Sequence, residues 1–278
     1  MLDKLERLPA DTILGLAAAC RADPNPAKVD LTVGIYMDEQ GLCPVFDAVR
    51  QAQLELVSQE RTKAYMPPAG DEAFNLGMQR LVLGEDSSAL RDKSVGSIQA
   101  PGGCVALRIG AEIIVAAAPK ARVWVSDPTW AVHFPLLGSA GLAFETYRYY
   151  DAASHGVDFD AMVEDLRKAV AGDVVLLHGC CHNPCGADLS LEQWGVIAGM
   201  AQQQGFTPFI DIAYQGLGDG LDQDAAGLRL MVEQLPEVII AASCSKNMGL
   251  YRERVGIAQF VCRDEANAQA LVSQALVA

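Results

Sequence analysis

Lys246 is the residue whose type and position best suit covalent chemistry. It follows an apolar run in the stretch ASCSKNMGLYRERVG, which spans residues 242–256. That run predicts a buried strand, and open α/β sheets bind their ligands at strand ends. An ammonium group in a partly dry pocket loses its proton more readily, which makes the amine a usable nucleophile. A lysine on a solvated loop is the competing interpretation, so the neighbouring motifs have to decide.

A carboxylate, a phenol and an amide follow two other predicted strands. Asp211 interrupts the apolar run of IDIAYQG, and Tyr214 comes three residues later. A buried carboxylate is costly unless a cation or a strong donor faces it. Asn183 lies in LLHGCCHNPCG, in a turn that follows a further strand. Each of these residues also has an ordinary structural interpretation when it is taken alone.

An aromatic residue and a glycine turn mark two further places along the chain. VSDPTWAVHF puts Trp130 and His133 at the exit of a predicted strand, and APGGC at 100–104 precedes a predicted helix. A glycine turn before a helix exposes backbone N–H groups that suit an anion such as phosphate. Taken alone, each has a structural interpretation: Trp130 as a core aromatic side chain, His133 as a histidine whose hydrogen bonds are satisfied within the fold, and the glycine pair as an ordinary turn.

Together these features form a set that matches pyridoxal phosphate. The glycine turn suits its phosphate, the aromatic side chain suits its ring face, and the carboxylate suits its ring nitrogen. The phenol and the amide suit the ring hydroxylate, and the lysine amine suits the aldehyde. The residues therefore predict a pyridoxal phosphate site at the strand ends of one sheet, with Arg254 nearby.

The elements that must position these residues alternate between strands and helices beyond residue 100. This alternation predicts βαβ units and a mainly parallel sheet flanked by helices. Apolar runs predict strands at residues 122–126, 143–147, 174–178, 208–212, 238–242 and 257–262. Apolar positions three and four apart predict helices at residues 105–118, 159–170, 191–204 and 225–234. Asp158, Ser190 and Asp224 are the predicted N-caps.

The first hundred residues follow a different pattern. Helical spacing at residues 13–22, 46–60 and 72–83 is separated by loops rich in Pro, Gly and Asp, which predicts an appendage to the sheet. We expect an N-terminal arm and small-domain segment over residues 1–45, and a cofactor-binding large domain over residues 46–278.

The net charge, the apolar stretches and the cysteines of the chain limit the functions and the cellular compartments to be expected. The formal net charge of −14 argues against nucleic-acid binding, because phosphate neutralisation needs a basic face. No apolar stretch is long enough to cross a bilayer, and the N-terminus lacks the pattern of a secretory signal. Eight scattered cysteines suit free thiols in a reducing compartment. We expect a cytoplasmic protein that binds neither nucleic acid nor membrane.

The order of the motifs resembles one family. PGG, SDPTWxxH, HGCCHNPxG, DIAYQG and SxSKNxGLYxERVG, with YMPPAGDEAF near the start, are similar to the aspartate and aromatic amino acid aminotransferases. These are class I, fold-type I pyridoxal phosphate enzymes, and the resemblance covers essentially the whole chain. It implies a homodimer that transaminates between aspartate or an aromatic amino acid and a 2-oxo acid, through an aldimine on Lys246.

The resemblance also implies roles for the residues already singled out. Lys246 would anchor the cofactor and then move the proton between the substrate α-carbon and the cofactor. Asp211 would keep the ring nitrogen protonated, and Tyr214 with Asn183 would hydrogen-bond the ring hydroxylate. Trp130 would stack on the ring. Lys246, Asp211 and Tyr214 are thus the expected catalytic residues.

The remaining implied roles fall into three groups. His133 and His178 would support Asp211 without contacting the cofactor themselves. Trp130, Asn183 and Gly34 would contact the substrate. The phosphate would be held by Gly102, Gly103, Cys104, Ser243 and Arg254, and by Tyr65 reaching in from a second subunit.

The sequence departs from the family pattern at two positions and in its extent. Cys104 and Cys185 stand where the family has threonine, and a thiol at Cys104 is a weaker donor to phosphate, which predicts slightly lower cofactor affinity. Family members continue into a C-terminal small domain whose arginines clamp the substrate carboxylates. We expect that domain to be absent here, so the alternative function is a catalytically impaired cofactor-binding protein.

A metal site is the third interpretation. Cys180, Cys181, His182 and Cys185 are close in sequence, but adjacent cysteines lack the usual C-x₂-C spacing. The family resemblance already accounts for this segment, so no metal is expected.

Overall fold

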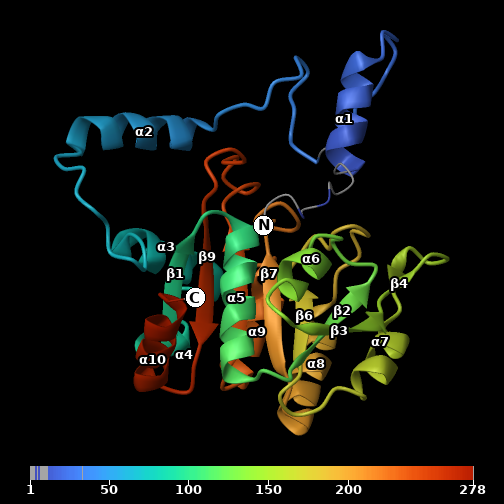
Figure 1. Ribbon diagram of the computed structural model, residues 1–278, viewed down its shortest axis with the longest axis vertical. Helices are drawn as coiled ribbons and strands as arrows, with labels where there is room; N and C mark the ends of the chain where they lie inside the picture. The colour runs from blue at the N-terminus through green and yellow to red at the C-terminus, as the bar shows by residue number, and fades with distance from the viewer. Residues whose placement is uncertain (1–3, 5, 7–11, 33, 278) are drawn as a thin grey trace. The chain divides into compact units, whose positions relative to one another are not determined.

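The computed structural model describes residues 4, 6, 12–32 and 34–277, and it divides into two units (Figure 1). The first unit, residues 1–45, contains helix α1 (Thr12–Ala22). The second unit, residues 46–278, contains the other elements and is built on a sheet covered by helices. Every candidate site residue except Gly34 belongs to the second unit.

The centre of the second unit is a seven-stranded sheet with the strand order β1-β9-β8-β7-β6-β2-β3. Neighbours from β8 to β3 run parallel, whereas β9 is antiparallel to both β8 and β1. The mainly parallel α/β sheet expected from the sequence is confirmed. The strands are β1 (Val95–Ala100), β2 (Arg122–Asp127), β3 (Ala143–Arg148), β6 (Val174–His178), β7 (Thr207–Ile212), β8 (Val238–Ser243) and β9 (Gly256–Val261), with a separate pair β4 (Tyr150–Asp151) and β5 (Gly156–Val157).

Helices cover both faces of the sheet, so two apolar cores form. Neighbouring residues of a strand face opposite sides, and in β7 Phe209 belongs to one core and Ile210 to the other. On the side of Phe209 lie α5 (Gly103–Ala117), α6 (His133–Gly138) and α10 (Glu265–Ala275). On the side of Ile210 lie α3 (Glu72–Leu83), α4 (Ser88–Arg91), α7 (Phe159–Leu166), α8 (Leu191–Gln204) and α9 (Ala226–Gln234).

Most of the predicted elements are confirmed, with α3, α8 and β6 at their predicted bounds. The appendage prediction is wrong for residues 72–100, because α3 packs on β1 and β1 is a strand of the main sheet. Helix α7 ends at Leu166, short of the predicted Val170. The Val170 N–H donates instead to Asp173 Oδ2 at 3.1 Å.

Short polar side chains start two of the helices as the sequence predicts. Asp158 accepts a hydrogen bond from the Ala161 N–H at 3.2 Å at the start of α7. Ser190 and Gln193 form a capping box at the start of α8, in which each side chain accepts from the other's backbone N–H. These caps satisfy N–H groups that have no partner inside the helix.

The N-cap prediction for Asp224 is wrong. Helix α9 begins after Ala225, and no side-chain cap is found there among the described residues. The Asp224 carboxylate accepts instead from the N–H groups of Gly216, Gly218 and Asp219, at 2.8, 2.9 and 2.7 Å. Asp224 therefore braces the loop that follows β7.

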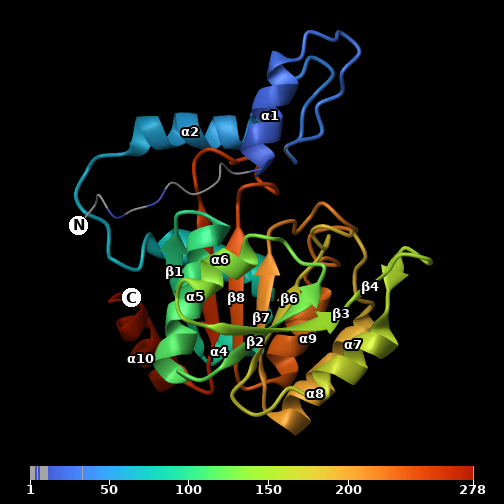
Figure 2. The ribbon, with the colours of Figure 1, turned by 45° about the vertical axis from the view of Figure 1, so that its right-hand side comes forward.

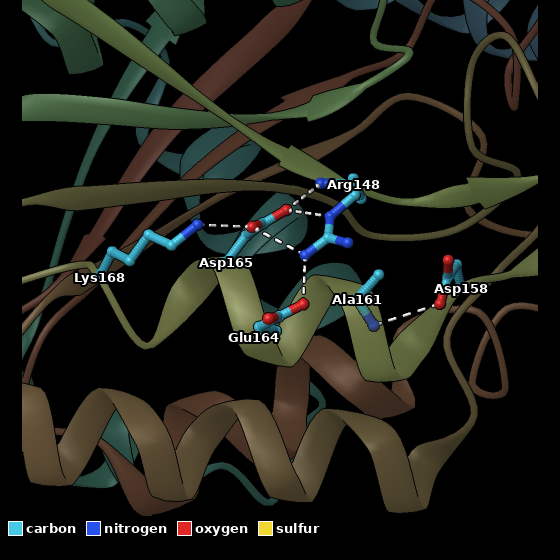
Figure 3. Close-up of polar contacts among 6 residues, drawn as sticks. All are labelled: Arg148, Asp158, Ala161, Glu164, Asp165 and Lys168. Atoms are coloured by element: carbon cyan, nitrogen blue, oxygen red, sulfur yellow. Dashed lines mark hydrogen bonds and ion pairs between the residues drawn. The ribbon is translucent and has the colours of Figure 1, made fainter.

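A cluster of charged groups ties the edge strand β3 to α7 (Figure 3). The Arg148 side chain donates from Nε to Asp165 Oδ2 at 2.7 Å and from Nη2 to Asp165 Oδ1 at 3.0 Å. The Lys168 Nζ donates to the same carboxylate at 2.8 Å. Hydrogen bonding from Arg148 outweighs the effect of burial and lowers the pKa of Asp165 well below its ordinary value.

We predict that Asp165→Asn destabilises the protein at neutral pH but not in acid. The folded pKa of Asp165 lies below the unfolded value of about 4, so its stabilisation is present above pH 4 and is lost as pH falls further. The expected loss at pH 7 is about 1 kcal/mol, because solvent screens the half-exposed Arg148. Urea unfolding at several pH values measures this difference. Glu164→Gln is the control: its side chain is 65% exposed, so little change is expected, and a pH-independent loss in Asp165→Asn contradicts the prediction.

Two further properties concern the helices and the cysteines of the described residues. None of the helices in the described ranges combines the length and the apolar character that a bilayer crossing requires. The eight cysteines are free thiols.

Candidate active site

The carboxyl ends of three parallel strands bring the candidate residues to one edge of the sheet. β6, β7 and β8 pair in that order, and Figure 2 shows β7 and β8 side by side. Asn183 follows β6, Tyr214 follows β7 and Lys246 follows β8. Helix α5 starts at the same edge, directly after β1. This is the edge at which open α/β sheets bind ligands.

Asp211 is held by a buried histidine. His133 is fully buried, and its Nε2 lies 3.1 Å from Asp211 Oδ2. A carboxylate only accepts, so this nitrogen is the donor. Thr129 Oγ1 lies 2.9 Å from His133 Nδ1 and 3.2 Å from His178 Nε2. The chain of contacts fixes the orientation of the carboxylate.

Two further histidines pack behind this chain and are uncharged at neutral pH. Burial, followed by the charges of the other histidines, lowers the pKa of His178 well below its ordinary value. Burial lowers the pKa of His182 to about 4. The His182 ring stacks on Tyr149 with a centroid distance of 4.3 Å. These rings therefore add no positive charge beside Asp211.

Tyr214 lies close to Lys246 and to Asp211. The Lys246 Nζ sits 5.2 Å from the centre of the Tyr214 ring. Burial, followed by the negative charge of Asp211, raises the pKa of Tyr214, whereas a hydrogen bond with Asn183 opposes that rise. The phenol therefore keeps its proton at neutral pH and can donate a hydrogen bond.

The start of α5 forms a cradle with groups from β8 and from the loop before β9. Gly102 has a φ of +82°, and a Cβ added there would lie 2.4 Å from Arg254 Nη2. The Arg254 Nη1 donates to Ser245 Oγ at 3.3 Å, and the Ser245 N–H donates to Ser243 Oγ at 3.1 Å. A Cβ at Gly103 would lie 3.3 Å from the Ser243 Cβ. Guanidinium, hydroxyls and helix N–H groups thus converge on a space suited to an anion.

The cradle depends on a close approach of three backbone segments. β9 starts at Gly256, where an added Cβ would lie 2.7 Å from the Gly102 carbonyl carbon and 2.8 Å from the Ala242 oxygen. Any other side chain at Gly256 would push these segments apart. The ends of β1 and β8 and the start of β9 are therefore joined at one point.

Trp130 and Cys104 flank these groups. Trp130 is half-buried and packs against the core under α5 and α6. Its ring meets the His133 ring edge-on, with centroids 5.3 Å apart. Cys104 is the second residue of α5 and is half-buried. Both positions are compatible with the roles that the resemblance implies.

For two candidate residues, the described chain shows no contact with the groups at this edge. Gly34 belongs to the first unit, is exposed, and has no described heavy atom within 4 Å of an added Cβ. Tyr65 is fully exposed, with a relative exposure of 105%.

Thr129 and Ser245 are site residues that sequence reasoning missed. Thr129 links His133 to His178, and Ser245 links Arg254 to Ser243. Both hydroxyls lie inside the motifs quoted for the site, so the motif could have pointed to them. Their partners, however, are set by the fold.

Residues 26–277 match the family model for class I and II aminotransferases. The chain belongs to this family. The aminotransferase is 47% identical to the aromatic-amino-acid aminotransferase of Paracoccus denitrificans over 96% of its own length and 67% of that relative. It is 44% identical to the aspartate aminotransferase of Escherichia coli K12 over 99% of its length and 69% of the relative.

Solved structures show the same fold. The aminotransferase superposes with a TM-score of 0.96 on an aromatic amino acid aminotransferase solved with 3-indolebutyric acid, at 45% identity, covering all of this chain and 70% of that one. A Burkholderia pseudomallei aromatic-amino-acid aminotransferase, described as covalently bound to pyridoxal phosphate, gives 0.96 at 39% identity, again over this whole chain and over 69% of that one. The aminotransferase is thus an enzyme of a family whose cofactor is pyridoxal phosphate.

Proposed function

We propose that the enzyme transfers an amino group between an aspartate or aromatic amino acid and a 2-oxo acid, with Lys246 at its centre. The observation that carries the proposal is the meeting of an amine, a histidine-held carboxylate and an anion cradle at one sheet edge. The names of the relatives support both substrate classes, since they include aromatic-amino-acid and aspartate aminotransferases.

The described residues fit pyridoxal phosphate. The cradle at Gly102 is a space that a Cβ would fill, and Arg254 points its guanidinium into it. Gly102, Gly103, Cys104, Ser243 and Arg254 would hold the phosphate. Trp130 would lie on the ring face, and Asn183 with Tyr214 would face the ring oxygen. Bound there, the cofactor supplies a ring that withdraws electrons from the substrate α-carbon.

Lys246 would act as the base in the proton transfer. Its amine takes the proton from the substrate α-carbon and returns it in the reverse half of the cycle. Tyr214 has a protonated phenol and lies beside the lysine, so it orients the amine without accepting its proton. Asn183 and Trp130 would also contact the substrate.

Asp211 would carry the negative charge that keeps the cofactor ring nitrogen protonated. An opposite charge within about 4–6 Å favours the protonated form of such a nitrogen by about 1–3 pKa units. His133 holds the carboxylate by a hydrogen bond, Thr129 contacts the other ring nitrogen of His133, and His178 contacts Thr129. His133 and His178 are thus positioning residues.

Absorbance spectra of the 278-residue chain with pyridoxal phosphate, beside Lys246→Ala, test the proposal. We expect a visible band that requires Lys246 and that bleaches when aspartate or phenylalanine is added. A band that forms but ignores both amino acids would support the alternative, a cofactor-binding protein that does not transaminate. The absence of a Lys246-dependent band would overturn both.

We predict that Gly102→Ala weakens binding of pyridoxal phosphate by about tenfold to a hundredfold. The new Cβ would lie 2.4 Å from Arg254 Nη2 and displace the guanidinium from the cradle. Gly172→Ala is the matched control, because Gly172 also has a positive φ but no described heavy atom within 4 Å of an added Cβ. Fluorescence titration with the cofactor measures both affinities. Equal losses in the two variants would mean that backbone strain, and not the cradle, causes the effect.

We further propose that the enzyme is a homodimer in which Tyr65 reaches the partner's phosphate. Within the described chain, α2 (Asp47–Gln59) has no buried residue. Its Leu54, Leu56 and Val57 are 68%, 63% and 80% exposed, and Tyr65 lies in the segment that follows. A second copy of the chain would cover this apolar surface.

Tyr65→Phe is therefore expected to weaken cofactor binding by about tenfold, which corresponds to one lost hydrogen bond to a charged group. The mass of the particle should not change. Sedimentation and cofactor titration measure the two properties. A stable monomer with full cofactor occupancy would refute this role for Tyr65.

A further inference from the structure

Two adjacent cysteines and an aspartate form a cluster that the proposed transamination does not use. Cys180 and Cys181 follow β6, and Asp224 precedes α9. One sulfur from each cysteine and a carboxylate oxygen of Asp224 all lie within 4.8 Å of one another, the one such group of three found in the described part of the chain. Cys180 and Asp224 are buried, whereas Cys181 is half-buried and offers access from solvent.

The backbone holds the two thiols on the same side. Adjacent residues of a strand point to opposite sides, but Cys181 has a φ of +48° and lies outside the strand. Asp188 fixes this turn, because its carboxylate accepts from the N–H groups of Cys181 and His182 at 2.6 and 2.8 Å. The thiols are therefore held near each other by the fold and need no bridging group to bring them together.

The surroundings of the thiols are strongly acidic. Burial is the main cause that raises the pKa of both thiols, and Asp188 and Asp224 raise the pKa of each further. Asp219 adds to the effect on Cys181. The carboxylate of Asp224 beside the two sulfurs and that of Asp188 at the Cys181 N–H suit a cation here.

We propose that Cys180, Cys181 and Asp224 form a binding site for a soft divalent cation of the zinc and cadmium class. Two sulfurs and one carboxylate oxygen are a donor set for such ions, and the fourth tetrahedral position is left to water. Binding replaces two S–H bonds by two metal–sulfur bonds and releases two protons to solvent.

Asp224 can bind such a cation only by giving up one of its weaker hydrogen bonds. Its carboxylate accepts three hydrogen bonds, from Gly216, Gly218 and Asp219, and a carboxylate offers about four lone-pair sites. A weaker interaction with the Gly220 N–H would be displaced by the cation. The bound ion would then join the turn after β6 to the loop that follows Tyr214.

This donor set differs from the one considered from the sequence. His182 is already engaged on both ring nitrogens, since Nε2 lies 2.9 Å from Ser126 Oγ and Nδ1 lies 3.1 Å from Cys185 Sγ. Asp224, which is distant in sequence, takes their place. The proposed metal ligands are thus Cys180, Cys181 and Asp224, and not the set of Cys180, Cys181, His182 and Cys185.

Titration of the full chain with Cd²⁺ tests the proposal, with the ultraviolet charge-transfer absorption of thiolate–cadmium bonds as the readout. We expect one high-affinity ion per chain and at least about tenfold weaker binding in Cys181→Ser, since even outer groups of a metal site contribute that much. Cys185→Ser is the matched control, because Cys185 is half-buried in the same turn. Lys246→Ala should bind Cd²⁺ normally, which separates this site from the proposed transamination.

A second measurement uses the unaltered chain and so does not depend on the folding of a variant. Zn²⁺ should protect Cys181 from alkylation by iodoacetamide and leave the alkylation of Cys185 unchanged, as read by peptide mass spectrometry. Equal weakening in Cys181→Ser and Cys185→Ser, no high-affinity absorption, or unprotected Cys181 would each overturn the proposal.

Discussion

Lys246→Ala is expected to slow amino transfer by at least about 10⁴-fold, because in the proposed function the side chain would supply both the anchoring amine and the base. The lysine lies at the end of β8 beside Tyr214, and its amine is 5.2 Å from the centre of the tyrosine ring. Tyr214 cannot take over as base, since burial and Asp211 raise its pKa. Steady-state rates with aspartate and with phenylalanine measure the loss.

Lys120→Ala is the control for this substitution. Lys120 is exposed in the turn between α5 and β2, at the opposite edge of the sheet, so its loss should leave the rate unchanged. Equal rates in Lys246→Ala and the unaltered chain would remove Lys246 from the mechanism. A similar loss in both variants would indicate a general effect on folding.

Asp211→Asn carries the second largest expected effect, a fall in kcat of about 10²- to 10³-fold, the range found when one preorganised electrostatic contact is removed. The amide keeps the shape of the carboxylate but carries no charge to hold the ring nitrogen protonated. The substitution should therefore lower kcat more than it raises KM.

Two further variants separate the charge of Asp211 from its surroundings. Asp222→Asn is the control, because the Asp222 side chain is 82% exposed on a loop that follows the same strand. His133→Gln should have a smaller effect and should alter the pH profile, since His133 positions Asp211. A kcat in Asp211→Asn close to that of the unaltered chain would contradict the assigned role.

Local sequence patterns predicted the helices and strands whose signals lie within a single short segment. α8 has an apolar face, a Ser190 cap and a following Gly205 with positive φ, and it was predicted at its observed bounds. β1 was missed because its sequence, VGSIQA, includes Gly96 and Ser97, which have weak strand preference. It becomes a strand by pairing with β9, which lies far away along the chain.

The candidate site was predictable in its residue types and less so in its contacts. Positions at or just beyond strand ends pointed to Asp211, Asn183 and Lys246, because strand ends meet at one edge. The link through Thr129 joins groups distant in sequence, so no local pattern reveals it. At Asp224 the local pattern predicted a helix N-cap that does not form. The carboxylate accepts instead from three N–H groups of the preceding loop.

The place of β1 at the edge of the sheet has a consequence for the order of folding. β1 is hydrogen-bonded to β9, and the glycine turn of the cradle follows β1 directly. Contacts between segments so distant in sequence slow folding, so we expect this pairing to form late. During synthesis the nascent chain therefore lacks a finished phosphate cradle until β9 has emerged and docked. Binding of pyridoxal phosphate at the proposed cradle would thus report that the sheet has closed at this edge.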